Sequence, residues 1–145
     1  MSGKRPRTLT VMKALLLAFL GALLSFTAVT LIALEGREVV VLRTFSADGQ
    51  TRATRTWVAD YQGSPFIEAA NPEREFLRDI QRNPSVELVR QGSTQRLRAT
   101  VLPQPLGHET IRHLLRQKYG WADRWIALLT DTSDSLAIRL DSEGD

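Results

Sequence analysis

One uninterrupted apolar segment constrains the fold of this chain more than any other feature. Residues 14–34 read ALLLAFLGALLSFTAVTLIAL, 21 positions without a charge, in which only Ser25, Thr27 and Thr30 are polar. A helix of this length rises about 1.5 Å per residue and spans a hydrocarbon core of about 30 Å. A buried core helix is the alternative, but the 111 residues that follow are too few to enclose such a run. The segment is therefore predicted to be a single-pass transmembrane anchor.

A secretory signal peptide is the other interpretation of an apolar segment near an N-terminus. Its apolar core is shorter, about 7 to 15 residues, and a cleavage site between small residues follows it. The run in this chain is longer, and no clear site of that kind comes after it. An uncleaved anchor is therefore favoured over a cleaved signal.

Charge is distributed unevenly along the chain. Residues 1–13 form a basic leader with Lys4, Arg5, Arg7 and Lys13, whereas all 16 acidic and 15 of the 19 basic residues lie from Glu35 onward. The net charge of +3 therefore belongs to the leader, and a general basic surface for nucleic acid is not indicated. The positive-inside rule predicts a cytoplasmic N-terminus and a domain outside the membrane, with the opposite insertion as the alternative.

Several kinds of chemistry find no support in the residue content. The chain has no cysteine, which excludes disulfides, thiolate nucleophiles and cysteine-ligated metal centres. His108 and His113 are five positions apart, off the spacing of three or four that brings helix residues together, so no metal site is expected. No Gly-x-Ser-x-Gly elbow, phosphate-binding P-loop or His-Glu-x-x-His motif occurs.

Periodicity and turn signals predict a domain of strands and helices over residues 37–140. Strands are expected at 37–45, 51–60, 65–70, 85–90, 94–102 and 135–140, and helices at 72–82, 109–119 and 121–129. Residues 141–145 are expected to be a disordered tail. The order β-β-β-α-β-β-α-α-β fits a small antiparallel barrel with attached helices better than a parallel α/β sheet.

The last predicted helix has apolar residues at the spacing of a core-facing stripe. These residues are Trp121, Ala122, Trp125, Ile126 and Leu129. Tyr119 and Trp121 can also be read as aromatic residues that stack on a bound ring. Burial in the core is the expected outcome.

A candidate anion site lies within residues 51–78. A strand carrying Arg52 and Arg55 is followed, after a second strand, by Asn71 as the expected helix cap and by a proline at the first helical position. The free amides and positive dipole end of such a helix start bind anions such as phosphate, and Arg74 lies in the same turn. The simpler interpretation is that the cap binds nothing and the arginines form a solvated face.

Several of these segments resemble the flavin-binding split-barrel superfamily, which includes pyridoxamine-phosphate-oxidase-like proteins and deazaflavin-dependent nitroreductases. The segments are VVVLRTF, TRATRTWV, IEAANPEREFLRDIQRNPSVEL and KYGWADRWIALL. The resemblance covers residues 37–140 and implies a mainly β, α+β fold: a six-stranded antiparallel split barrel, here preceded by one transmembrane helix. It also implies a homodimer with the cofactor ring near the subunit interface.

The same resemblance implies that FMN or a deazaflavin is bound by the second strand and by the strand-to-helix segment. The matching positions would contact the phosphate, flank the ring or donate hydrogen bonds, and they are Arg52, Arg55, Thr56, Trp57, Asn71 and Arg74. One departure concerns the loop after the first strand. Its sequence, SADGQ, lacks the basic residue usual in the deazaflavin-dependent nitroreductases, which reduces its capacity for anions and leaves the identity of the cofactor open.

Two functions from different classes are compatible with these features. The first is a membrane-anchored oxidoreductase, similar to a nitroreductase or quinone reductase, in which the reduced cofactor passes a hydride to a small acceptor and no acid-base residue is needed. The second is a non-catalytic, membrane-anchored binding or accessory module that keeps the barrel. The predicted location outside the membrane favours the second, because flavins and deazaflavins are made in the cytosol.

Overall fold

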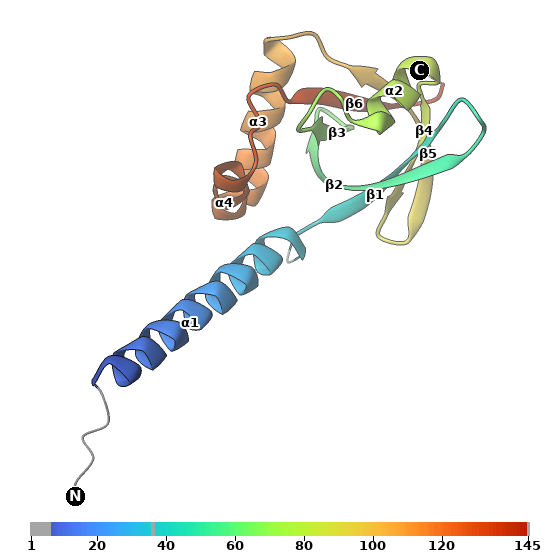
Figure 1. The fold of residues 1–145 in the computed structure, drawn as a ribbon. Helices are drawn as coiled ribbons and strands as arrows, with labels where there is room; N and C mark the ends of the chain where they lie inside the picture. The colour runs from blue at the N-terminus through green and yellow to red at the C-terminus, as the bar shows by residue number, and fades with distance from the viewer. Residues whose placement is uncertain (1–6, 36, 145) are drawn as a thin grey trace, which may run out of the picture.

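The computed structural model describes residues 7–35 and 37–144, and it consists of a long helix attached to a barrel domain (Figure 1). The long helix is α1 (Arg7–Glu35). Three further helices accompany the barrel: α2 (Glu75–Arg82), α3 (Leu106–Tyr119) and α4 (Trp121–Leu129). The strands are β1 (Val39–Phe45), β2 (Thr51–Tyr61), β3 (Ser64–Ala69), β4 (Ser85–Arg90), β5 (Ser93–Val101) and β6 (Leu136–Ser142).

The six strands form a closed barrel in the order β1-β2-β3-β6-β5-β4, and every neighbouring pair is antiparallel. Pairing of β1 with β4, with Leu42 opposite Leu88, closes the ring. Closure leaves no unpaired strand edge between the first and last strands. The predicted six-stranded antiparallel barrel is confirmed.

Two tight hairpins set the strand register. The β2–β3 turn contains Gln62 and Gly63, with φ of 51° and 85°, and the β4–β5 turn contains Gln91 and Gly92, with φ of 49° and 79°. Two successive positive φ angles define the turn whose twist matches that of antiparallel strands, and glycine adopts them without strain.

One hydrophobic core fills the barrel, and α2 covers it. Apolar residues of the strands alternate inward and meet the buried face of α2. The wholly or almost wholly buried members include Val40, Leu42, Val86, Leu88, Ile138 and Leu140 from the strands and Phe76, Leu77 and Ile80 from α2. A second cluster lies between α3 and the outer surface of the barrel and is centred on Ile111, Leu115 and Tyr119.

The start of α2 differs from the prediction. The helix begins at Glu75 with Arg74 at the cap position, so Asn71 does not cap it. Asn71 instead accepts a hydrogen bond from the Glu73 amide, 2.8 Å from its side-chain oxygen, and its carbonyl accepts one from the Arg74 amide at 3.2 Å. Asparagine before proline favours such a side-chain turn as strongly as a helix cap, because both use the same acceptor two residues upstream of the donor.

One boundary and one burial prediction need correction. β6 continues to Ser142, where Asp141 and Ser142 pair with Arg98 and Leu97 of β5, so the predicted disordered tail begins too early. In α4, only Ala122 of the five expected core residues is fully buried. Trp121 and Leu129 are 46% and 48% exposed, and the prediction that they belong to the core is wrong.

Candidate functional site

A cavity of about 310 Å³ lies beside β2. Its walls come from β1, β2, β3, the start of α2, α3, α4 and the end of α1. The lining residues are Leu34, Val39, Thr54, Arg55, Thr56, Trp57, Glu68, Ala69, Ala70, Arg74, Phe76, Leu115 and Ile126. We refer to this space as the β2 cavity. Its volume lies at the lower end of the range of about 300 to 1,000 Å³ that small-molecule sites occupy.

Four of the six residues implied by the resemblance line this cavity: Arg55, Thr56, Trp57 and Arg74. Arg55 and Arg74 are exposed to solvent, and Thr56 and Trp57 are half-buried. The cavity thus combines two guanidinium groups with apolar surface from Trp57, Phe76 and Leu115.

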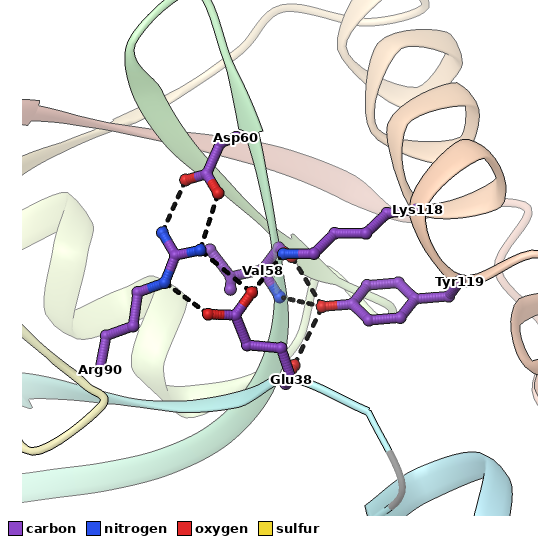
Figure 2. A network of polar contacts seen from close by, with 6 residues as sticks. All are labelled: Glu38, Val58, Asp60, Arg90, Lys118 and Tyr119. Carbon is purple, nitrogen blue, oxygen red and sulfur yellow. Dashed lines mark hydrogen bonds and ion pairs between the residues drawn. The ribbon is translucent and has the colours of Figure 1, made fainter.

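The aromatic wall formed by Trp57 is held in place from behind. Its ring stacks on that of Tyr119, with centroids 4.6 Å apart and planes inclined by 27°. The phenolic oxygen of Tyr119 lies 2.7 Å from the Val58 carbonyl oxygen and 2.9 Å from that of Glu38 (Figure 2). Burial raises the pKa of Tyr119 to about 12, so the phenol keeps its proton at neutral pH and remains a donor.

A network of charged side chains helps to hold Tyr119 in this position. Figure 2 shows Arg90 between two carboxylates, with its guanidinium nitrogens 2.7 Å from the oxygens of Asp60 and 2.6 and 3.0 Å from those of Glu38. The Lys118 ammonium contacts Glu38 as well and donates to the Val58 carbonyl at 2.7 Å. The hydrogen bonds from Arg90 lower the pKa of Glu38 to about 2, although burial opposes this. The network joins the residue before β1 to β2, β4 and α3, and its side chains do not line the cavity.

Glu68 of β3 lines the β2 cavity, and its carboxylate is paired with Arg112. Arg112 of α3 reaches both Glu68 oxygens at 3.0 and 3.1 Å and both Asp123 oxygens at 2.6 and 2.7 Å. Arg112 and Asp123 are buried, with 8% and 2% of their surface exposed. Arg112 therefore offsets part of the negative charge that Glu68 brings to the cavity.

Arg52 and Asn71 lie outside the cavity lining. The Arg52 Nε atom is 3.0 Å from Oδ2 of Asp79, and its guanidinium also pairs with Glu75, so it fastens β2 to α2. Asp79 is almost fully buried and accepts a second hydrogen bond, from the Thr44 hydroxyl at 2.9 Å. Asn71 is exposed and takes part in the turn before α2.

Sequence reasoning did not find several residues of the cavity. Leu34 and Ile126 are apolar residues of helices, and nothing in their own segments distinguishes them from their neighbours. Glu68 gave the one usable signal, because it is a carboxylate within the otherwise apolar segment PFIEAA. A charged side chain inside such a strand commonly marks a partner or a ligand.

The residues of the cavity fit a flat aromatic body with an anionic tail. Trp57, Phe76 and Leu115 offer apolar and aromatic contact, and Arg55 and Arg74 offer charged donors suited to phosphate. A flavin mononucleotide or a deazaflavin cofactor has this combination of parts.

Three solved structures illustrate what the chain resembles. The conserved hypothetical protein Rv2991 from Mycobacterium tuberculosis matches with a TM-score of 0.60 and 15% identity over 74% of each chain. A putative pyridoxamine 5′-phosphate oxidase from Listeria innocua matches with a TM-score of 0.55 and 17% identity over 78% of this chain and 90% of the other. A protein titled F420-H2 dependent reductase (FDR-A) matches with a TM-score of 0.56 and 16% identity over 72% and 95%.

Comparisons of sequence gave no relative. No protein-family model matches the chain, and no curated protein matches it in sequence. The three structural matches are below 20% identity, so they establish the fold and not the activity. This chain has the split-barrel fold of the pyridoxamine-phosphate-oxidase-like proteins and the F420-dependent reductases.

Proposed function

We propose that this chain is a membrane-anchored oxidoreductase that binds FMN or a deazaflavin in the β2 cavity and reduces a small acceptor. The observation that carries the proposal is the pairing of a fixed aromatic wall, Trp57 on Tyr119, with Arg55 and Arg74 in one cavity. Two of the structurally similar proteins are named as an oxidase and a reductase, which agrees with redox chemistry.

The residues of the chain would bind and orient the cofactor. Arg55 and Arg74 would hold its anionic tail, and the Trp57 face would contact its ring. Apolar side chains such as Phe76 and Leu115 would exclude water from the reacting face. A bound reduced flavin or deazaflavin would supply the hydride and solvent the proton that completes the reduction, so no general acid or base of the protein is required.

The anchor is part of the proposal. Within the described residues, one helix, Thr10–Leu34, is long and apolar enough to cross a membrane, with a mean hydropathy of 2.4. None of its most apolar window is buried by the rest of the chain, which disfavours a core helix. Contacts of Phe26 and Thr30 with Trp125 join it to the folded domain, which favours retention over cleavage as a signal.

A homodimer is also proposed, because the resemblance places the cofactor ring near a subunit interface. Arg55 and Arg74 are exposed in the single chain, so a second copy would enclose the anionic tail more fully. Light scattering of the full chain in detergent measures the assembly. A mass corresponding to one chain at every concentration would contradict this part of the proposal.

The test of the binding site is a comparison of two arginine variants of the full-length chain in detergent. FMN and deazaflavin are titrated separately, and binding is followed by quenching of tryptophan fluorescence. Arg55→Gln removes a cavity cation and is expected to weaken binding by about tenfold to a hundredfold, the loss of one charge-assisted hydrogen bond. Arg139→Gln is the matched control, since Arg139 pairs with Asp141 on β6 and does not line the cavity.

A stability control and two contradicting results complete this test. Unfolding temperatures measured without cofactor show whether either variant is destabilised. Equal weakening in the two variants would contradict the assigned site. A protein that stays colourless on purification and whose melting temperature neither cofactor raises would remove the oxidoreductase proposal.

A non-catalytic accessory module is the second candidate. One structural observation favours it: the β1–β2 loop has no basic residue, and its Asp48 is hydrogen-bonded to Ser46. That loop therefore presents a carboxylate where a phosphate-binding loop presents cations. Absence of cofactor binding in the titration above would select this candidate.

A further inference from the structure

Helix α4 exposes a stripe of large apolar side chains. Trp121, Leu128 and Leu129 are 46%, 80% and 48% exposed, and Trp125 is half-buried between them. Their positions, i, i+4, i+7 and i+8, place them on one face of the helix. The helix packs onto the domain through Ala122, next to the stripe, and Asp123, on the opposite side. Four large apolar residues on one face of a nine-residue helix form the kind of exposed apolar patch that marks an interaction surface.

The stripe lies beside the apolar helix α1. The rings of Phe26 and Trp125 are 5.5 Å apart, and the Trp125 indole nitrogen donates to the Thr30 hydroxyl at 3.1 Å. Figure 1 shows α4 next to the upper part of α1. Phe26 and Thr30 precede the end of the span by eight and four residues, which corresponds to about 12 and 6 Å along the helix. Helix α4 is thus level with the last third of α1.

The charges around the stripe suit a membrane interface. The Arg37 guanidinium lies 5.4 Å from the centre of the Trp121 ring, just beyond the end of the span. The single acidic residue of α4, Asp123, is buried against Arg112, so α4 itself presents no carboxylate to lipid. Asp131 and Asp134 follow the helix and are exposed. Tryptophan with arginine beside it is the usual composition at the boundary between lipid and water.

We propose that α4 is embedded in the membrane interface. Its stripe of Trp121, Trp125, Leu128 and Leu129 would form a second contact with the leaflet in which α1 ends. The inference rests on the proposed anchoring by α1. If α1 spans the bilayer, a helix packed level with its last third meets lipid before it can meet a soluble partner. Burial of apolar side chains to a depth of about 5 to 10 Å is typical of helices that lie in the interface.

The chain has no cysteine, so single cysteines can be introduced for spin labelling without removing native ones. Three variants of the full-length chain are compared in phosphatidylcholine vesicles: Leu128→Cys on the stripe, Leu20→Cys within the span and His113→Cys on the exposed side of α3. The measured quantity is the accessibility of each label to oxygen, which partitions into lipid, relative to a water-soluble nickel complex.

The expected result is a ratio of oxygen to nickel accessibility at residue 128 that is several-fold above that at residue 113 and approaches that at residue 20. A water-like ratio at residue 128 with a lipid-like ratio at residue 20 would overturn the proposal for α4 and leave the anchor intact. Water-like ratios at both would overturn the anchor as well. Low accessibility to both reagents at residue 128 would show that protein, such as a second copy of the chain, covers the stripe, and would also overturn the proposal.

Discussion

At the level of single residues, Arg52 is held between two carboxylates of α2, although its position on β2 suggests a ligand contact. Its Nε atom is 3.0 Å from Asp79, which is almost completely buried. Arg52→Ala is expected to lower the free energy of unfolding, because a buried carboxylate loses its charged partner. Urea denaturation followed by tryptophan fluorescence measures this.

Arg96→Ala is the control for this substitution. Arg96 is mostly exposed and lies 3.9 Å from Glu87, so its loss is expected to cost less than about 1 kcal/mol. Arg52→Ala is also expected to keep its affinity for FMN or deazaflavin. If Arg52→Ala leaves stability unchanged but abolishes cofactor binding, Arg52 belongs to the binding site instead.

The lowered pKa of Glu38 predicts how the free energy of unfolding depends on pH. Its pKa is lowered from 4.5 to about 2, chiefly by the hydrogen bonds from Arg90. The stabilisation is therefore complete above about pH 4.5 and is lost as the pH falls toward 2, with a magnitude of up to about 3 kcal/mol. In Glu38→Gln the free energy of unfolding at pH 7 should be lower and its fall between pH 4.5 and 2 shallower than in the wild type. The exposed Glu73→Gln serves as control, and an identical acid profile for Glu38→Gln and wild type would contradict the assignment.

At the level of elements, Arg112 is the main polar connection between α3, α4 and β3. Both of its carboxylate partners, Glu68 and Asp123, are at most slightly exposed. Arg112→Met is expected to destabilise the domain by about 3 to 5 kcal/mol, because it leaves two carboxylates without their cation. Arg116→Met, one turn later on the exposed side of α3, should cost less than about 1 kcal/mol.

Thermal unfolding of the two variants distinguishes them. Adding Glu68→Gln and Asp123→Asn to Arg112→Met should recover part of the stability, since the uncompensated charges are then removed. If Arg112→Met and Arg116→Met unfold at the same temperature, the ion pairs contribute nothing measurable.

The sequence predicted most elements, and its failures have physical causes. Alternation of apolar residues identified the strands, because a half-buried strand repeats every second residue. Asn71 was misassigned because a helix cap and a side-chain turn use the same acceptor. Trp121 and Leu129 were assigned to the core because an apolar helix stripe has the same spacing whether it faces protein or another apolar surface.

The candidate site was only partly predictable for a related reason. Arg55 and Trp57 are close in sequence, and a local pattern with a family resemblance located them. Leu34, Glu68 and Ile126 reach the β2 cavity from three separate elements. Which side chains share a cavity follows from barrel closure and helix packing, and neither is encoded in a local pattern.

At the level of the whole molecule, the four basic residues before the span predict the orientation in the membrane. An alkaline phosphatase reporter fused after residue 145 is expected to be active outside the cytoplasmic membrane of a bacterial host. Neutralising the leader with Lys4→Gln, Arg5→Gln, Arg7→Gln and Lys13→Gln should reduce that activity. An inactive reporter on the intact chain, with the fusion present at normal levels, would contradict the predicted orientation and remove the difficulty of supplying a cytosolic cofactor.

Leu34 is both the last residue of the apolar span and part of the cavity wall, and only residues 36–38 separate α1 from β1. With α1 inserted, the opening on β2 is kept at one height above the lipid, and no long tether lets the barrel swing away from the surface. An acceptor that dissolves in the leaflet would then reach the protein by searching an area, whereas a water-soluble one must search a volume. Partitioning into the leaflet would therefore raise the concentration of lipid-soluble acceptors at the cavity before any side chain contacts them.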